Sequence, residues 1–302
     1  MIRKLDDLLK KAQEQKTMRL AVAAAHDEDV LQSIQDAFDA GIVEPILIGD
    51  LEKMQSIAKE LEVDLTKFKV VDIADFEAAA IEAARLVSTG EADFLMKGIL
   101  DTSILLKAVL KKDFGLRTDN LISHVLIYEP PTYHKLLTVT DGGMNITPSL
   151  DEKASILQNA VDCLKAMGRE EIKVACIAAK EKVSDKMQAT LDGAELKKYS
   201  LEGRFGPGVI VEGPIAFDLA VSTEAAKIKN YESDVSGDAD VLLVPTIEVG
   251  NGIGKSLTYM ANAKSAGIIM GARVPVVLVS RADSAETKLY SIALGSLISA
   301  KA

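Results

Sequence analysis

Short apolar runs alternate with helical patterns along much of this chain. Four of the runs predict β-strands by their length and composition: residues 19–25, 45–49, 68–73 and 94–98. The stretches between them predict helices, and Asp27 stands where it can cap the first one, which we expect to end near Gly41. Strands that alternate with helices through short connections favour a mostly parallel sheet with helices on both faces.

This rhythm changes after Gly98. Two apolar runs, 121–128 and 135–141, are separated only by E-P-P-T-Y-H, which predicts a hairpin-like pair of strands. The alternation of strands and helices resumes at Asp151. Strands are expected at 172–178, 209–212, 241–245 and 274–279. The expected helices are one that ends at Met167, one that starts near 184, one that spans 254–266 and a last one that starts at 284. We therefore expect two α/β lobes, the first from 1–135 plus 268–302 and the second from 136–267, with an active-site cleft between them.

The composition narrows the classes of partner. Of 302 residues, 48% are hydrophobic but only 4% are aromatic and none is Trp, so the core must be aliphatic. The formal net charge of −10 argues against a general nucleic-acid binder, which would carry a basic face. An anionic ligand stays possible, because a few local cations can dominate the potential of a binding site.

Nothing in the chain predicts contact with a membrane. No segment approaches the ~20 consecutive apolar residues of a spanning helix, and the first residues lack the apolar run of a signal peptide. Cys163 and Cys176 lie in apolar stretches without a C-x-x-C pattern, which predicts reduced thiols in the core. We expect a soluble, cytoplasmic protein.

Polar and glycine-rich turns follow four of the expected strands. They are Lys97-Gly98, Asp141–Pro148, Thr246–Ser256 and Ser280-Arg281. Ligands of α/β sheets bind beyond the carboxyl ends of the strands. Glycines, cations and hydroxyl groups at several equivalent positions indicate a shared pocket.

The segment G-N-G-I-G-K-S (250–256) is not a nucleotide-binding fingerprint. The phosphate loop G-x-x-x-x-G-K-[ST] needs glycine at 249, where Val249 stands, and G-x-G-x-x-G fails because its last position is Lys255. We expect a backbone anion nest at a helix N-terminus here. The alternative is a flexible glycine-rich turn with a surface lysine.

Other catalytic patterns find little support. His26, His124 and His134 lack metal-ligand spacing, so no metal site is expected, and no G-x-S-x-G elbow or Cys–His neighbour occurs. A guanidinium at a strand end, such as Arg281, costs desolvation unless it meets an anion. That anion is either a bound ligand or a carboxylate such as Asp283 or Glu286.

Taken together, several of these motifs resemble the phosphate acetyltransferase/phosphate butyryltransferase family. They are S-R-A-D-S at 280–284, D-G-G-M-N-I-T-P, E-G-P-I-A-F-D-L-A at 212–220, and P-T-I-E-V-G-N-G-I-G-K. The similarity spans nearly the whole chain in order, and the S-R-A-D-S form is most similar to the butyryl or branched-chain phosphotransacylase branch.

The resemblance implies a two-lobed α/β fold like that of isocitrate and isopropylmalate dehydrogenases, assembled into homodimers or larger homo-oligomers. It implies the reaction acyl-CoA + phosphate ⇌ acyl phosphate + CoA, with a butyryl or branched short-chain acyl group. Our hypothesis for the mechanism is direct attack by the CoA thiolate in a ternary complex. Coenzyme A is then a substrate, and neither a permanently bound cofactor nor a metal is required.

The family's residue roles carry over only in part. The resemblance assigns catalysis to Ser280 and Arg281, with Arg281 holding the phosphoryl group. Thr287 occupies the position of an aspartate base in the acetyl branch, so Asp283 and Glu286 are nearby candidates that the match does not supply. The remaining expected site residues are Lys97 or Lys107 for phosphate in place of a missing arginine, Asp141 and Asn145 in the second lobe, and Gly250, Asn251, Gly254 and Lys255 for CoA.

Three alternatives stay open at the level of sequence. The nearest is a phosphate acetyltransferase. A decarboxylating NAD-dependent dehydrogenase has the same implied fold, but the expected aspartate cluster and nicotinamide site are not found. The last is a non-catalytic CoA-binding protein.

Overall fold

The computed structural model describes residues 2–280 and 282–301, and its contacts divide the chain into two compact units. Unit I comprises Leu5–Asn120 and Ala266–Ala302, and unit II comprises Leu121–Ser265 with Met1–Lys4. The first change of unit therefore falls earlier in the chain than the expected 135/136. The reason is that the strand following residue 121 pairs with the next strand of unit II.

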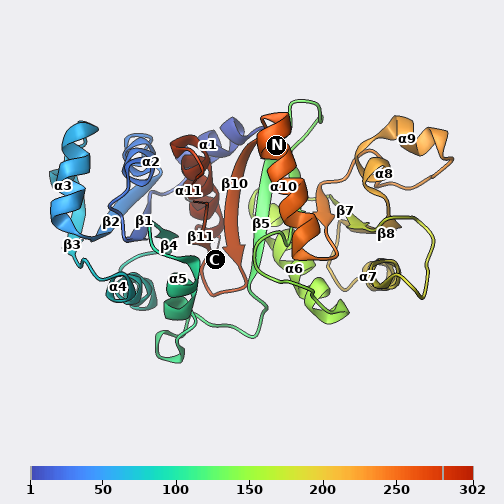
Figure 1. Ribbon diagram of the computed structural model, residues 1–302, viewed down its shortest axis with the longest axis horizontal. Coiled ribbons are helices and arrows are strands. Elements are labelled where there is room, and N and C mark those ends of the chain that lie inside the picture. Colours follow the sequence, from blue (N-terminus) through green and yellow to red (C-terminus); the bar gives the residue numbers. More distant parts are fainter. Residues whose placement is uncertain (1, 281, 302) are drawn as a thin grey trace. The chain divides into compact units, whose positions relative to one another are not determined.

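Unit I is built on a mostly parallel sheet (Figure 1). Its strands, in spatial order, are β3 (Lys69–Asp72), β2 (Val43–Gly49), β1 (Met18–Ala23), β4 (Phe94–Lys97), β11 (Val276–Val277) and β10 (Lys264–Met270). Neighbouring strands from β3 to β11 run parallel, whereas β10 is antiparallel to β11. The parallel sheet predicted for this region is confirmed.

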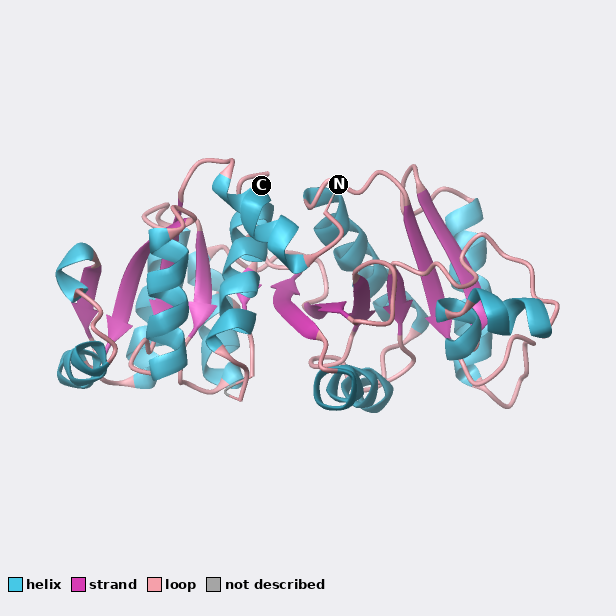
Figure 2. Cartoon of the chain, turned by 90° about the horizontal axis from the view of Figure 1, so that it is seen from above, coloured by secondary structure: helices cyan, strands magenta, loops and turns pink. Residues whose placement is uncertain are grey.

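Helices cover both faces of this sheet (Figures 1 and 2). They are α1 (Leu5–Gln13), α2 (Glu28–Asp39), α3 (Leu51–Glu60), α4 (Phe76–Ser88), α5 (Thr102–Val109) and α11 (Ala285–Ser299), with two short 3-10 turns at Leu65–Lys67 and Lys112–Phe114. Helix α11 packs on α1 and α2, while α4 and α5 pack on each other. Asp27 caps α2 as predicted, because its side chain accepts a hydrogen bond from the Val30 amide at 3.0 Å.

Unit II contains a second run of strands. In spatial order they are β5 (Ser123–Glu129), β6 (Leu137–Thr140), β9 (Val241–Leu243), β7 (Ile172–Ile177) and β8 (Val209–Ile215). β5 and β6 are antiparallel, so the predicted hairpin-like pair is confirmed, and the other neighbours are parallel. The helices of this unit are α6 (Leu150–Ala166), α7 (Gln188–Leu201), α8 (Phe217–Val221), α9 (Thr223–Ile228) and α10 (Ile247–Ala261).

The core is mostly aliphatic in both units, as the composition predicted, with a few buried aromatic rings such as those of Phe94 and Tyr290. In unit I the buried strands β1 and β2 carry Leu20, Val22, Leu47 and Ile48, each with no exposed surface. In unit II, side chains from the sheet, α8 and α9 form one buried cluster that includes Val139, Leu219 and Leu242, and α10 packs partly buried side chains against it. Burying a side chain of this size contributes about 1.5–3 kcal/mol, so the strands are held mainly by these aliphatic contacts.

One helix prediction is wrong, and some elements were not predicted. The helix expected at 254–266 spans Ile247–Ala261, and the segment K-S-A-G-I-I-M that follows is strand β10. Asn262 ends the helix with φ of 51°, a left-handed conformation that asparagine tolerates. Helix α5, in the stretch where the alternation weakened, was also not predicted.

None of the helices in the described part of the chain combines the length and the apolarity that crossing a bilayer requires.

Candidate active site

The carboxyl ends of β1, β4 and β11 lie at one edge of the unit I sheet. β4 pairs in parallel with β11 through Met96 and Val277. Lys97 is the last residue of β4, and Ser280 follows β11 after two further residues. The register of the two strands therefore brings Lys97 and Ser280 to the same edge, where α/β sheets bind ligands.

The Lys97 ammonium is buried in the turn that follows its own strand. The residue is 5% exposed, and its Nζ donates hydrogen bonds to the carbonyl oxygens of Gly98 at 3.0 Å and Leu100 at 3.1 Å. Carbonyl oxygens satisfy a buried ammonium without cancelling its charge. Lys97 thus places an ammonium group at this edge, bound to the backbone of the turn that follows.

Gly98 permits a close approach between two strand ends. A Cβ at this position would lie 2.0 Å from the carbonyl oxygen of Ala24, which follows β1. The same backbones are joined by hydrogen bonds from Gly98 N to Ala23 O and from Ile99 N to Ala24 O. Only glycine allows the turns after β1 and β4 to lie against each other.

His26 lies beside this contact, after β1. It is buried, its ring stacks on that of Phe76, and its Nδ1 accepts a hydrogen bond from the Asp50 amide at 3.4 Å. Burial, with a smaller effect of the Lys53 ammonium, lowers the pKa of His26. The imidazole is therefore neutral near pH 7 and adds no charge to the edge.

Ser280 and Asp283 close a small turn before α11. The Ser280 amide donates to Asp283 Oδ2 at 2.8 Å, and the Asp283 amide donates back to the Ser280 carbonyl at 3.1 Å. The Ala282 amide donates to Ser280 Oγ at 3.3 Å. Sequence reasoning placed both residues at the site, and the structure brings them together. Arg281, between them, lies outside the described residues.

Thr287 belongs to the capping arrangement of α11. Its amide donates to the side chain of Ser284, the N-cap residue, at 3.3 Å. The Ser284 and Thr287 hydroxyl oxygens lie 3.4 Å apart. A threonine in this position stabilises the start of the helix but cannot act as a carboxylate base.

Lys107 occupies a different part of unit I. It lies in the last turn of α5 and is exposed. It lines a small groove of about 70 Å³ between α4 and α5, together with Glu77 and Ile81. Of the two lysines expected to replace the missing arginine, Lys97 is the one at the end of a strand.

In unit II, Asp141 and Asn145 form a closed turn after β6. Asp141 is 2% exposed, and its Oδ1 accepts hydrogen bonds from the amides of Gly143 and Met144 at 2.8 and 2.9 Å. Its Oδ2 accepts from Asn145 Nδ2 at 2.6 Å, and the same amide group donates to the Ile122 carbonyl. Asp141 therefore shapes the D-G-G-M-N turn through its own hydrogen bonds.

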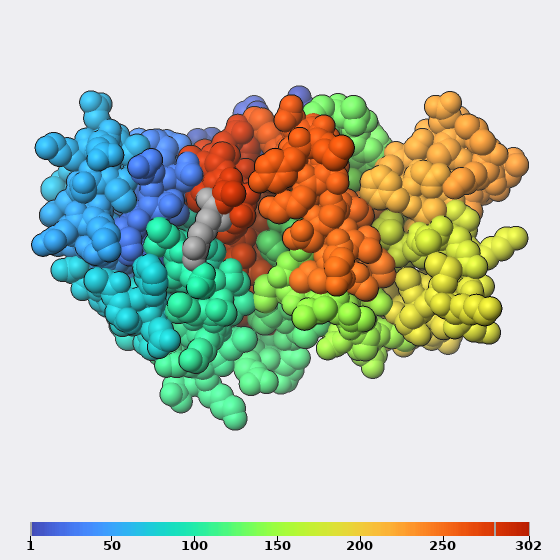
Figure 3. Space-filling view, in the orientation of Figure 1, coloured from blue at the N-terminus to red at the C-terminus, as the bar shows by residue number. Residues whose placement is uncertain are grey.

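The expected anion nest at G-N-G-I-G-K-S is wrong in its placement. Helix α10 begins at Ile247, so this segment lies within the helix, with Thr246 as the N-cap residue. The segment is also not a flexible turn, which removes the alternative. Part of α10, coloured orange, lies at the surface in the space-filling view (Figure 3).

Packing explains two of the glycines in α10. A Cβ on Gly250 would lie 2.7 Å from the Cα of Gly142, and one on Gly254 would lie 2.4 Å from the Tyr128 hydroxyl oxygen. Asn251 and Lys255 are exposed, and Asn251 Nδ2 lies 3.5 Å from the Gly142 carbonyl oxygen. The four expected CoA residues thus divide into two packing glycines and two surface side chains.

Alanine scanning of the α10 glycines tests this division. Gly250→Ala is expected to lower the free energy of unfolding by about 1–3 kcal/mol, because backbone atoms of the facing turn must move. Gly252→Ala is the matched control, since its Cβ meets nothing within 4 Å, and it is expected to stabilise the helix by about 0.5–1 kcal/mol. Urea unfolding of both variants measures the difference; equal effects would contradict the packing role.

Neither cysteine is a reactive nucleophile. Cys163 and Cys176 are free and buried, as predicted, and burial raises the pKa of each thiol to about 12. Both remain protonated at neutral pH and are poor nucleophiles. Within residues 2–280 and 282–301, no group of three or more His, Cys, Asp or Glu side chains is arranged to hold a metal ion.

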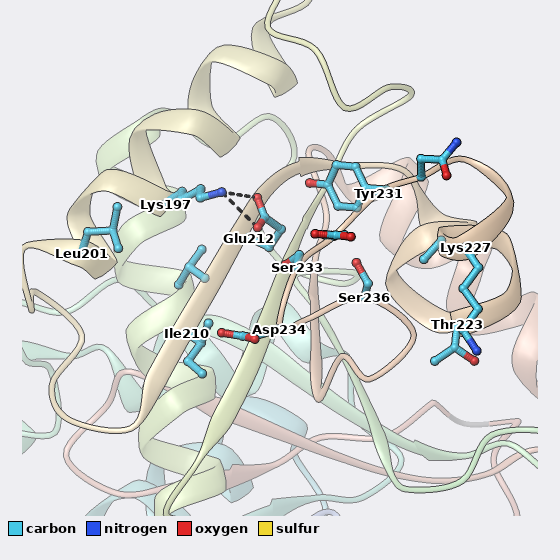
Figure 4. A pocket seen from close by; sticks show the side chains of 14 residues that line it. Lys197, Leu201, Ile210, Glu212, Thr223, Lys227, Tyr231, Ser233, Asp234 and Ser236 are labelled. Atoms are coloured by element: carbon cyan, nitrogen blue, oxygen red, sulfur yellow. Dashed lines mark hydrogen bonds and ion pairs between the residues drawn. The ribbon is translucent and has the colours of Figure 1, made fainter.

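Glu212, the first residue of the E-G-P segment, lines a pocket of about 860 Å³ in unit II (Figure 4). Glu212, on β8, is 8% exposed and pairs with Lys197 of α7, whose Nζ lies 2.7 and 3.0 Å from the two carboxylate oxygens. A Cβ on Gly213 would lie 2.8 Å from the Gly193 carbonyl oxygen, so glycine lets α7 pack tightly on β8. The segment that contributed to the resemblance thus has a packing role.

Sequence reasoning missed one side chain at the S-R-A-D-S turn. Lys288, in the first turns of α11, is 2% exposed, and its Nζ donates a hydrogen bond to the Asp283 carbonyl oxygen. A lysine at the fourth residue of a helix ordinarily points to solvent, so its position in the sequence gives no signal. The structure shows that the Lys288 side chain points beneath the turn, and the sequence does not indicate this direction.

The chain matches one known protein family over most of its length. The family described as "Phosphate acetyl/butaryl transferase" matches residues 4–82 and 76–296. The chain belongs to this phosphate acetyl/butyryl transferase family. The predicted resemblance is confirmed.

Full-length relatives within the family carry both the butyryl and the acetyl name. The chain is 43% identical over 298 residues to a phosphate butyryltransferase of Clostridium acetobutylicum, covering 99% of each chain. It is 40% identical over 298 residues to a phosphate acetyltransferase of Rhizobium meliloti, covering 99% of this chain and 94% of the relative.

Solved structures agree with this fold. The crystal structure of a branched-chain phosphotransacylase from Enterococcus faecalis superposes with a TM-score of 0.83 at 34% identity, covering 94% of this chain and 99% of the other. A 4-hydroxythreonine-4-phosphate dehydrogenase from Klebsiella pneumoniae shares the fold alone, with a TM-score of 0.56 at 11% identity and coverage of 94% and 99%. The expected α/β fold of dehydrogenase type is confirmed.

Proposed function

We propose that this chain transfers a butyryl or branched short-chain acyl group between coenzyme A and inorganic phosphate. The observation that carries this proposal is the 43% identity to a phosphate butyryltransferase across 99% of both chains. The cationic edge formed by Lys97 beside the S-R-A-D-S turn supports it, because holding phosphate against a thioester requires fixed positive charge.

The proposed reaction is a direct exchange in a ternary complex. A phosphate oxygen forms a bond to the thioester carbonyl carbon, the C–S bond breaks, and CoA leaves as a thiolate. In the reverse direction the thiolate attacks the carbonyl carbon of the acyl phosphate, and phosphate leaves. Neither direction needs an acyl-enzyme, which agrees with two buried cysteines whose thiols stay protonated.

Each proposed residue has a distinct task. Arg281 binds the phosphate oxygens through its guanidinium fork, and Lys97 adds a second positive charge. The Ser280 hydroxyl donates to the carbonyl oxygen that gains charge in the tetrahedral state; one such donor is worth roughly 2.7–4 kcal/mol. Asp283 is the carboxylate nearest to Ser280 along the turn, and it orients that turn through the Ser280 amide.

Unit II supplies the proposed CoA-binding surface. Asn251 and Lys255, on the exposed side of α10, are proposed to contact the CoA, with Lys255 facing its phosphates. Gly250 sets how closely α10 lies to the turn of Asp141 and Asn145, which we propose to stay part of the substrate-binding surface, and Gly254 sets its distance from Tyr128 of β5. We further propose a homodimer or larger homo-oligomer, measurable by analytical ultracentrifugation.

One assay distinguishes the candidate functions. Butyryl-, isobutyryl- and acetyl-CoA are each mixed with the protein, and free thiol is followed with and without phosphate. We expect thiol release that depends on phosphate and is fastest with a four-carbon acyl group. We also expect the release to persist when a chelator is present, because Arg281 and Lys97 rather than a metal ion supply the positive charge. Fastest turnover of acetyl-CoA would favour a phosphate acetyltransferase. Release that ignores phosphate would indicate thioester hydrolysis and contradict the proposal.

A further inference from the structure

Lys288 is a buried cation beneath an exposed turn. The residue is 2% exposed, whereas Ser280 and Ala282, in the turn above it, are exposed. Burying an ammonium group is costly unless hydrogen bonds or an opposite charge compensate for it. A lysine in this position therefore needs hydrogen-bond acceptors or a carboxylate close to its ammonium group, and the identity of these groups indicates the role of the side chain.

Among residues 2–280 and 282–301, two groups meet the Lys288 ammonium. Its Nζ donates a hydrogen bond to the backbone carbonyl of Asp283, the last residue of the turn before the N-cap. The carboxylate of Asp29, in the first turn of α2, lies 3.8 Å away and is about half exposed. The closer, hydrogen-bonded partner is thus the backbone of the turn, and the carboxylate is a weaker, partly solvated neighbour.

The bond to the Asp283 carbonyl holds a turn that is otherwise closed on itself. Within the turn, the Ser280 amide and carbonyl are both bonded to Asp283. The short side chains of Ser280 and Ala282 are exposed and bury little surface. The ammonium at the Asp283 carbonyl therefore ties the Asp283 end of the turn to α11.

We propose that Lys288 is a positioning residue that sets the place and orientation of the S-R-A-D-S turn, and thereby of the phosphate-binding group at Arg281. This inference rests on the proposed function. Lys288 does not touch substrate in this proposal; it acts through the Asp283 carbonyl. A displacement of about 1 Å in a reacting group costs about 100-fold in rate, so a loosened turn has a measurable kinetic effect.

The kinetic test compares three variants. Lys288→Met keeps the length of the side chain but removes the donor, and is expected to lower kcat/KM for phosphate by about 100-fold while the KM for acyl-CoA stays near the wild-type value. Lys288→Arg restores a donor and is expected to recover most of that loss. Asp29→Asn is the matched control, because it removes the neighbouring charge and leaves the hydrogen bond to the turn intact.

A second variant covers the case in which Lys288→Met does not fold. Asp283→Ala removes the carboxylate that holds the Ser280 amide and leaves Lys288 in place, so it loosens the same turn from above. It is expected to show the same selective loss of phosphate kcat/KM. Wild-type phosphate kinetics in whichever of these two variants folds would overturn the proposal, as would a loss in Asp29→Asn equal to that in Lys288→Met.

Hydrogen exchange provides a readout that needs no turnover. The peptide covering 277–286 is expected to exchange its amide hydrogens faster in Lys288→Met than in wild type, while peptides of unit II do not change. If no acyl-CoA is turned over, the proposed function fails but this measurement still tests the hold on the turn. Unchanged exchange in the 277–286 peptide would overturn the role of Lys288 even in an active enzyme.

Discussion

Arg281→Ala is expected to reduce phosphate-dependent thiol release by about three orders of magnitude. A guanidinium holds phosphate through two parallel hydrogen bonds and keeps its charge at all accessible pH values. Its removal leaves Lys97 at the strand-end edge and Lys288 beneath the turn, and both ammonium groups already donate to backbone carbonyls. The loss should appear mainly in the kinetics with respect to phosphate.

Arg281→Lys is the matched control for this variant. Lysine keeps the charge but loses the planar fork, so we expect a value between those of wild type and Arg281→Ala. Far-ultraviolet circular dichroism and the melting temperature should be close to wild type in both, because the position follows a short strand and precedes a helix with its own cap at Ser284. Near-wild-type turnover in Arg281→Ala would refute the phosphate-binding role.

Gly98→Ala is expected to have the largest structural effect of any single methyl group at this edge. The added carbon would lie 2.0 Å from the Ala24 carbonyl oxygen and 2.7 Å from that of Ala23. Both are backbone atoms, so β1 and β4 must separate where they end. We expect a loss of about 3 kcal/mol in the free energy of unfolding.

Activity should fall with this change, because Lys97 and the Gly98 carbonyl that it contacts belong to the displaced turn. Gly41→Ala serves as a comparison: this glycine has φ of +72° but its Cβ would meet nothing within 4 Å. A strained backbone without a steric clash should cost less stability and leave the phosphate kinetics unchanged. Equal stability of Gly98→Ala and wild type would show that the strand ends separate easily.

Much of the fold was predictable because apolar periodicity reports directly on burial. Strands such as β1 and β2 are apolar along nearly their whole length, as strands covered on both faces must be. β10 escaped prediction because K-S-A-G-I-I-M begins with polar and small residues directly after a helix. Helix α10 was misplaced since glycine at 250, 252 and 254 opposes a helix locally, while packing against the turn after β6 favours one.

The candidate site likewise has a part that the sequence predicts and a part that it does not. Residue types at strand ends identified Lys97, Ser280, Asp141 and Asn145, because position along the chain and polarity suffice to place them at an edge. The direction of a side chain is not encoded in such a pattern. Neither the burial of Lys288 nor the exposure of Lys107 could be read from the sequence.

The contact between Gly142 and Gly250 has a practical consequence for anyone who builds hybrids of this chain with its relatives. Each glycine leaves room for the backbone of the other. If either one is replaced by a residue with a side chain, the backbone of the facing segment must move away. Grafting residues 141–146 from a relative whose segment lacks glycine at the position of Gly142 will therefore require that 246–254 is taken from the same donor.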